Sequence, residues 1–137
     1  ATMIEVEVDR QPVASFVCDG LIVATPVGST GHALSAGGPI LHRATPALVL
    51  EPICPHTLSN RPVVLPNNRL VTLRVADQRK KLLLSVDGQP AGWLEAGDVL
   101  EIRKARESAR FVLLPGYSWF KLLSQKLHWR GSSGEPK

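Results

Sequence analysis

Aromatic residues are scarce in this chain, which contains three Trp, one Tyr and three Phe among 137 residues. Its basic residues gather at 79–81 and 103–106, and neither cluster is interleaved with aromatic side chains. Nucleic-acid-binding surfaces commonly combine basic groups with aromatic stacking platforms. We therefore expect no nucleic acid partner, and the net charge of +4 indicates either small anionic partners such as nucleotides and phosphates, or ordinary solvated charge.

Cysteine is also rare, with only Cys18 and Cys54. The two form no C-x-x-C pair and the four histidines share no metal-ligand spacing, which argues against a zinc site. Both cysteines lie in apolar runs, where a free thiol behaves as a small hydrophobic residue, so we expect both to be buried. Buried thiols and the lack of a leader sequence predict a cytoplasmic location.

Long apolar runs are missing as well, and those present are far shorter than the roughly 20 residues of a membrane span. We therefore expect no contact with a membrane. A composition of 44% hydrophobic and 20% charged residues indicates a globular domain with a core, and 11 Pro and 11 Gly indicate many turns.

Alternation of apolar and polar residues is the main pattern that is present. Residues 3–9 alternate strictly, and a second apolar segment follows after a short turn, which predicts a β-hairpin. Many short strands separated by turn signals predict a mainly β fold, a two-sheet β-sandwich. The expected strands are residues 3–9, 12–18, 21–25, 47–50, 63–65, 70–75, 81–86, 99–103 and 110–114.

Two helices are expected beside the strands. The first covers residues 30–36 and is ended by two glycines and Pro39. The second covers residues 118–129, with Ser118 as its cap, Gly131 as its end, and an apolar face that belongs either to the core or to a subunit interface. We expect one domain over residues 1–130 and a disordered tail over residues 131–137.

The segment 19–39 combines features of a ligand site. Its strand is stopped by Pro26, and Gly28, Ser29 and Thr30 lead into the first helix. Free amides beside two hydroxyls would form a cup for sugar hydroxyls, an amide or a phosphate, whereas the simpler alternative is that Ser29 only caps the helix.

Three other polar positions allow two interpretations each. Asp19 either accepts hydrogen bonds from ribose or amide groups, or caps a turn. The Asp87-Gly88-Gln89 segment is either a polar site or an ordinary hairpin turn. His56 and Arg61, between two proline-bounded segments, either bind a ligand or have a structural role.

These segments carry a resemblance. The run DGLIVATPVGSTGHALSAGGPILH, followed by PICPHTLSNRPVVLP, resembles the C-terminal domain of the NAD kinase family. The segments SVDGQ and GYSWFKLLSQKLHW resemble later motifs of the family and occur in the same order, so the resemblance extends over residues 3–130.

The resemblance implies both a reaction and a site. NAD kinases transfer the γ-phosphoryl group of ATP, which is accompanied by a divalent metal such as Mg²⁺, to the 2′-hydroxyl of the adenosine ribose of NAD, giving NADP. Their C-terminal domain is a β-sandwich that binds NAD and contributes to a homo-oligomer. By this resemblance, the residues that bind NAD are Asp19, Thr30, Gly31, His32, Ala33, Leu34, Ser35 and Gln89.

Two differences from the family pattern bear on binding. The family usually has Thr-Ala-Tyr where this chain has Thr30-Gly31-His32, and a basic residue often stands where this chain has Thr2. The imidazole of His32 offers a smaller ring than tyrosine, so we expect a different affinity for the substrate or a different preference between NAD and NADH.

The catalytic half of the family is missing from the sequence. The Gly-Gly-Asp-Gly loop and an Asn-Glu pair belong to an N-terminal α/β domain, and Pro39 stands after Gly37-Gly38 where the loop would have its acid. Because the chain opens directly into a strand, we expect a piece cut from a longer protein, with its own N-terminal domain as partner. We expect no catalytic residue, no metal bound by this domain alone, and no activity of the isolated chain. The alternative is a non-catalytic dinucleotide-sensing or interaction module.

Overall fold

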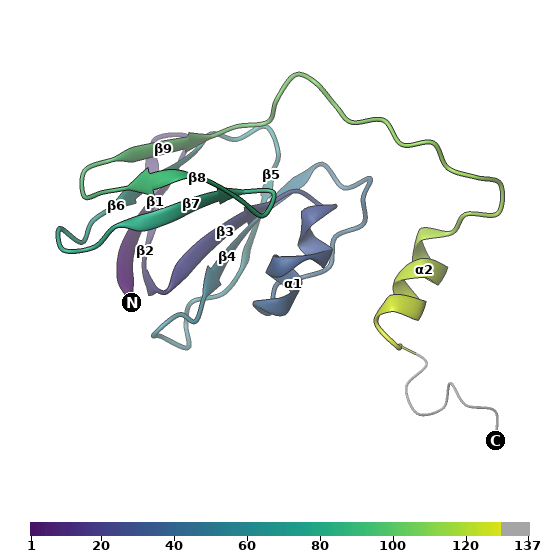
Figure 1. Ribbon diagram of the computed structural model, residues 1–137, viewed down its shortest axis with the longest axis horizontal. Coiled ribbons are helices and arrows are strands. Elements are labelled where there is room, and N and C mark those ends of the chain that lie inside the picture. Colours follow the sequence, from purple (N-terminus) through teal and green to yellow (C-terminus); the bar gives the residue numbers. More distant parts are fainter. Residues whose placement is uncertain (130–137) are drawn as a thin grey trace. The chain divides into compact units, whose positions relative to one another are not determined.

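The computed structural model describes residues 1–129, shown in Figure 1. It divides into one compact unit, Ala1–Ala105, and a second unit that begins at Arg106, and we describe each by itself. The tail predicted over 131–137 and the helix end predicted at Gly131 lie outside the described residues.

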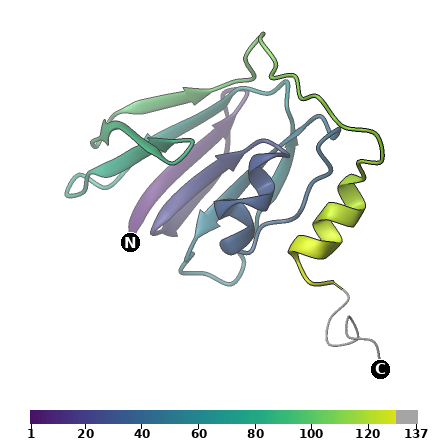
Figure 2. The same ribbon diagram turned by 45° about the vertical axis from the view of Figure 1, so that its right-hand side comes forward.

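The first unit is built from three antiparallel sheets, which confirms the prediction of a mainly β fold (Figures 1 and 2). The largest sheet has the order β2-β1-β6-β9, the second has the order β3-β4-β5, and the third is the hairpin β7-β8. The strands are β1 (Thr2–Val8), β2 (Gln11–Cys18), β3 (Gly20–Ala24), β4 (Ala47–Ile53), β5 (Val63–Pro66), β6 (Val71–Val75), β7 (Leu82–Val86), β8 (Gln89–Leu94) and β9 (Val99–Ile102).

The core lies between the first two sheets. Ile4 and Val6 of β1 are buried while their neighbours Met3 and Glu5 are exposed, as the alternation in the sequence predicts. These two residues pack with Phe16, Cys18 and residues of β6 against Leu50 of the central strand β4. Leu21, Val23, Val63 and Leu65 of the second sheet, and Leu82 of the hairpin, complete the cluster. Two sheets thus share one apolar core, as expected of a sandwich.

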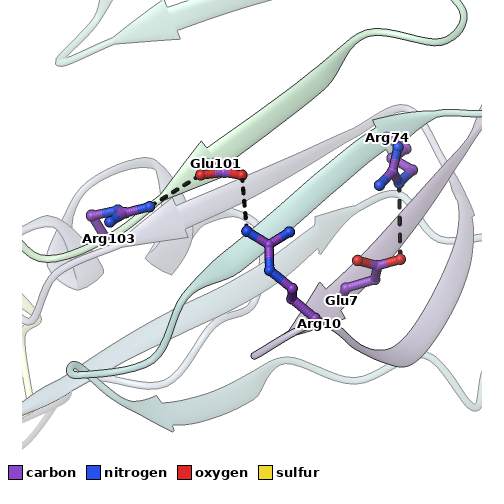
Figure 3. Close-up of polar contacts among 5 residues, drawn as sticks. All are labelled: Glu7, Arg10, Arg74, Glu101 and Arg103. Atoms are coloured by element: carbon purple, nitrogen blue, oxygen red, sulfur yellow. Dashed lines mark hydrogen bonds and ion pairs between the residues drawn. The ribbon is translucent and has the colours of Figure 1, made fainter.

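The outer face of the first sheet carries charged side chains (Figure 3). Arg103 and Arg10 reach Glu101 at 3.1 and 3.7 Å, and Arg74 reaches Glu7 at 3.9 Å. All five side chains are partly or largely exposed, so each pair contributes only about 0.2–1 kcal/mol. This face is accordingly a solvated surface, and Arg103 of the basic cluster at 103–106 is engaged within it.

Two hairpins use two-residue turns with positive φ. Asp9 and Arg10 have φ values of 49° and 64° between the paired residues Val8 and Gln11. The Asp9 carboxylate accepts hydrogen bonds from Leu70 N–H at 2.9 Å and from Arg69 at 3.0 Å, and these bonds lower the pKa of Asp9 below its ordinary value of 3.8. The turn therefore also ties the β1-β2 hairpin to the start of β6.

The strand β8 was not predicted. Its sequence, QPAGWL, contains Pro90 and Gly92, which are both unfavourable in strands. The structure accommodates them because the sheet has only two strands and its register shifts between Leu84 and Ser85. Asp87 and Gly88, with φ values of 50° and 79°, form the connecting turn, so the hairpin interpretation of this dipeptide is correct.

The second unit contains the helix α2 (Trp119–Lys126), and Ser118 caps it by accepting a hydrogen bond from Lys121 N–H at 3.3 Å. Of the predicted apolar face, Leu123 is buried and Leu127 half-buried, whereas Phe120 is exposed. The strand predicted over 110–114 is wrong for this structure, because residues 103–118 contain neither strand nor helix. A strand needs a neighbouring strand for its hydrogen bonds, and none of the described residues pairs with this segment.

Candidate functional site

The segment 19–39 begins with β3, which pairs with β4 from Gly20–Ile53 to Ala24–Val49. A 3₁₀ turn, η1 (Gly28–Thr30), and one turn of α-helix, α1 (His32–Ser35), follow it. The continuous helix predicted over 30–36 is therefore wrong in detail. Gly31, with φ −97° and ψ −125°, interrupts it, because this conformation is not helical. Gly37, with φ 96°, ends α1 as predicted.

Ser29 fixes the shape of this loop. Its side chain is fully buried, and its hydroxyl donates to the Pro26 carbonyl at 2.6 Å and accepts from Leu41 N–H at 3.2 Å. The interpretation that Ser29 caps the helix is wrong, since its hydroxyl makes no capping bond to α1. It instead joins the two ends of the loop, which holds the residues between them in a defined conformation.

The loop presents most of the residues expected to bind NAD to solvent. Thr30, Gly31, His32 and Ser35 are exposed, and Leu34 is half-buried. Ala33 is only 1% exposed, and its carbonyl already accepts a hydrogen bond from Gly38 N–H at 2.8 Å. The Thr30 hydroxyl donates to the Val27 carbonyl at 3.1 Å and retains its capacity to accept. Together with the Ser35 hydroxyl, the His32 imidazole and the Gly31 backbone, it suits polar contacts with a sugar or phosphate.

Asp19 lies at the start of β3, where its backbone N–H donates to Ile53 at 2.9 Å and its side chain is exposed. The chain returns toward this end of β3 after α1. Ala36 and Gly37 line a cavity together with Pro52, which pairs with Leu21, two residues after Asp19. The structure therefore brings the end of α1 and the start of β3 to one region.

Gln89 stands at the first position of β8, paired with Val86 across the Asp87-Gly88 turn, and it is exposed. Its side chain is available to a ligand, although it belongs to the two-stranded sheet and not to the loop after β3.

Glu51 is a candidate residue that the sequence analysis did not single out. It lies in the middle of β4, is 3% exposed, and its Oε2 atom has no hydrogen-bond partner among the described residues. Burial raises the pKa of this carboxyl above its ordinary value of 4.5. The surrounding strand is apolar on both sides, so a single acidic residue in a buried strand was the signal that could have identified it.

In the segment after β4, the exposure of the cysteine differs from the prediction. Cys54 is exposed and has a φ of 47°, so the prediction that both thiols are buried is wrong for this residue. Cys18 is buried as predicted, and burial raises the pKa of its thiol. His56 and Arg61 are exposed, and the backbone N–H of His56 donates to Val17 at 2.9 Å. The turn after β4 thus projects polar side chains while its backbone is attached to β2.

Residues 1–129 offer neither a cluster of metal ligands nor a helix suited to a membrane. Within residues 1–129, no three side chains of His, Cys, Asp or Glu come together as metal ligands. Over the same part of the chain, no helix has the length and apolarity that crossing a membrane requires.

Comparisons with known proteins point to one family. The family model described as the ATP-NAD kinase C-terminal domain matches residues 1–114. Proteins named NAD kinase are similar over most of the chain: that of Magnetococcus marinus is 43% identical over 130 residues, and that of Gemmatimonas aurantiaca is 46% identical over 127 residues. These matches cover 95% and 93% of this chain but only 43% and 44% of the relatives, so the chain spans less than half of their length.

Two solved structures share the fold. Yeast NADH kinase complexed with NADH matches with a TM-score of 0.79 and 27% identity, over 96% of this chain and 41% of that one. An NAD kinase from Archaeoglobus fulgidus in complex with ATP matches with a TM-score of 0.67 and 30% identity, over 77% of this chain and 40% of that one.

Proposed function

The chain belongs to the NAD kinase family as its C-terminal domain, and from this premise we propose that it forms the dinucleotide-binding part of an NAD kinase. The whole enzyme would transfer the γ-phosphoryl group of ATP to the 2′-hydroxyl of the adenosine ribose of NAD, giving NADP. The observation that carries this proposal is the loop held by Ser29, which exposes Thr30, His32 and Ser35 within one short segment.

In this proposal the chain binds and orients the dinucleotide. The hydroxyls of Thr30 and Ser35 and the imidazole of His32 contact its polar groups, with Gly31, Ala33 and Leu34 forming the backbone surface between them. Asp19 and Gln89 add an acceptor and an amide from β3 and β8. Positioning of a hydroxyl is a major part of phosphoryl transfer, because the reaction needs in-line geometry.

Mg²⁺, when bound with ATP, neutralises charge on the transferring phosphoryl group. The described residues provide no group of three ligating side chains, so they do not fit a resident metal site. We therefore assign the metal, the ATP contacts and the catalytic acid to the remainder of the parent protein, and derive no step through the metal.

We further propose that the chain's partners are its own N-terminal domain and further copies of itself, in the cytoplasm. Support comes from the length of the relatives, of which the chain covers 43–44%. It also comes from the second unit, where Phe111, Val112 and Leu114 are 67%, 93% and 77% exposed. Such a run of exposed apolar residues favours burial against another part of the complete protein.

An activity assay tests the proposal. The 137-residue chain and its full-length parent are incubated with NAD, ATP and Mg²⁺, and NADP is measured. We expect NADP from the parent and none from the chain alone, because the chain lacks the catalytic loop. NADP formation by the chain would contradict this division of roles, and a parent that binds NAD without forming NADP would favour the sensing module instead.

Binding by site variants tests the residues. Ser35→Ala removes an exposed hydroxyl from α1, whereas the matched variant Ser15→Ala removes one from β2, on the other sheet. We expect Ser35→Ala to weaken NAD binding by the parent roughly tenfold, the value of one hydrogen bond of about 1.4 kcal/mol. Equal affinities of the two variants would remove Ser35 from the site.

A further inference from the structure

A cavity of about 360 Å³ lies between the end of α1 and the segment after β4. Glu51 contributes to its wall, and this side chain is 97% buried with its Oε2 atom unpartnered among the described residues. A buried carboxyl oxygen without a hydrogen bond is costly, and native proteins retain one mainly where it has a task. The cavity is lined by Ala36, Gly37, Glu51, Pro52, Pro55, Asn60, Arg61 and Pro62.

The lining explains why the protein itself does not satisfy Glu51. Pro52, Pro55 and Pro62 have no backbone N–H, so three of the nearest chain positions have no donor to offer. Arg61 is exposed, and its Nη1 atom donates to the Asn60 carbonyl at 3.5 Å. The space beside the carboxyl is therefore lined by proline rings together with the polar groups of Asn60 and Arg61.

The backbone above Glu51 is shaped to admit its carboxyl. A methyl group at Gly38 would lie 3.0 Å from Glu51 Oε2 and 2.8 Å from the Ala33 carbonyl oxygen, which is too close for either atom. Glycine at this position thus leaves room for the acidic side chain beneath the loop that carries the NAD-contacting residues.

The chemistry of the cavity selects its occupant. A metal ion needs several ligands, and Glu51 is the only Asp, Glu, His or Cys in the lining. A flat heterocycle with one amino group fits this lining, because its ring faces pack on the proline rings and its N–H donates to the carboxylate.

We propose that Glu51 accepts a hydrogen bond from an amino group on a heterocycle of the bound dinucleotide. This inference rests on the proposed function. Two groups of NAD have this chemistry, the nicotinamide carboxamide and the adenine amine. Ala36 and Gly37 directly follow Ser35, so a dinucleotide that contacts α1 reaches the cavity without leaving the site.

The test measures dissociation constants of the full-length parent by calorimetry for NAD and two analogues. Nicotinic acid adenine dinucleotide replaces the carboxamide by a carboxylate, and nicotinamide hypoxanthine dinucleotide replaces the adenine amine by oxygen. The variants are Glu51→Leu, which removes the acceptor, Glu51→Gln, which keeps a neutral one, and Glu5→Gln, a control on the exposed face of β1. Circular dichroism verifies that each variant is folded.

We expect the wild type to prefer NAD over at least one analogue, and Glu51→Leu to weaken NAD binding at least tenfold and abolish that preference. The NAD affinity of Glu51→Gln should lie between those of the wild type and Glu51→Leu, and the affinity of Glu5→Gln should match that of the wild type. The analogue whose preference is lost identifies the amino group. Unchanged NAD affinity and unchanged preferences in both Glu51 variants would overturn the inference. A wild-type parent that binds no NAD would instead overturn the proposed function.

Discussion

At the scale of single residues, Glu51 lowers the stability of the free chain, and the proposed ligand would offset part of this loss. Its carboxyl is buried among apolar neighbours on β4 without a partner, so ionisation within the folded chain carries a desolvation cost. The proposed hydrogen bond to a ligand would recover part of this cost only in the complex. The free domain should therefore be less stable than its packing allows.

This cost has a defined pH dependence. Because burial raises the pKa of Glu51 above 4.5, the folded state holds the proton more tightly than the unfolded state. The stability that protonated Glu51 contributes is fully present below the pKa of the unfolded state. It is lost as the pH rises through the pKa of the folded state. We expect Glu51→Gln to melt close to the wild type at pH 4, and to be more stable by about 1–3 kcal/mol at pH 7. Thermal melts between pH 4 and 8 measure this, and a difference independent of pH would contradict it.

Residue roles could be predicted from the sequence only where a local pattern determined them. Gly37, Gly88 and Ser118 behave as predicted because turn and cap geometry depends on adjacent backbone. Ser29 and Glu51 could not be predicted. The partner of Ser29 is twelve residues away at Leu41, and the burial of Glu51 depends on how α1 and the loop cover β4.

At the scale of elements, α2 depends on its cap. It has eight residues, too short to be stable by propensity alone, and the Ser118 side chain caps its N-terminus with a hydrogen bond from Lys121 N–H. We expect Ser118→Ala to destabilise α2 by about 1 kcal/mol, raising hydrogen exchange of its amides roughly fivefold. Ser124→Ala, within the same helix, should not raise it, and equal exchange in the two variants would show that the cap contributes nothing.

Elements were predictable where periodicity and turns agreed. The β1-β2 hairpin and the strands of the sandwich follow from alternation and turn residues. The failures have specific causes: Gly31 divides a short helix, Pro90 and Gly92 conceal β8, and the apolar segment 110–114 has no partner strand among the described residues.

At the scale of the whole molecule, the segment 110–114 supports the proposal that the chain functions within a larger protein. Its sequence has the pattern of a strand, yet Phe111, Val112 and Leu114 are exposed. We expect its amides to exchange rapidly in the 137-residue chain and slowly in the full-length parent, where a partner would bury them. Exchange detected by mass spectrometry measures this, with β4 as the slowly exchanging control in both. Rapid exchange in the parent as well would refute the idea.

The bonds made by Ser29 make the conformation of the loop independent of the side chains that it exposes to solvent. Since the fixed geometry comes from a buried side chain, the solvent-facing neighbours can be exchanged without loosening the frame that supports them. Libraries that randomise positions 30, 32 and 35 while keeping Ser29 should thus yield folded proteins at high frequency. Such a loop is a suitable starting point for engineering altered cofactor preference.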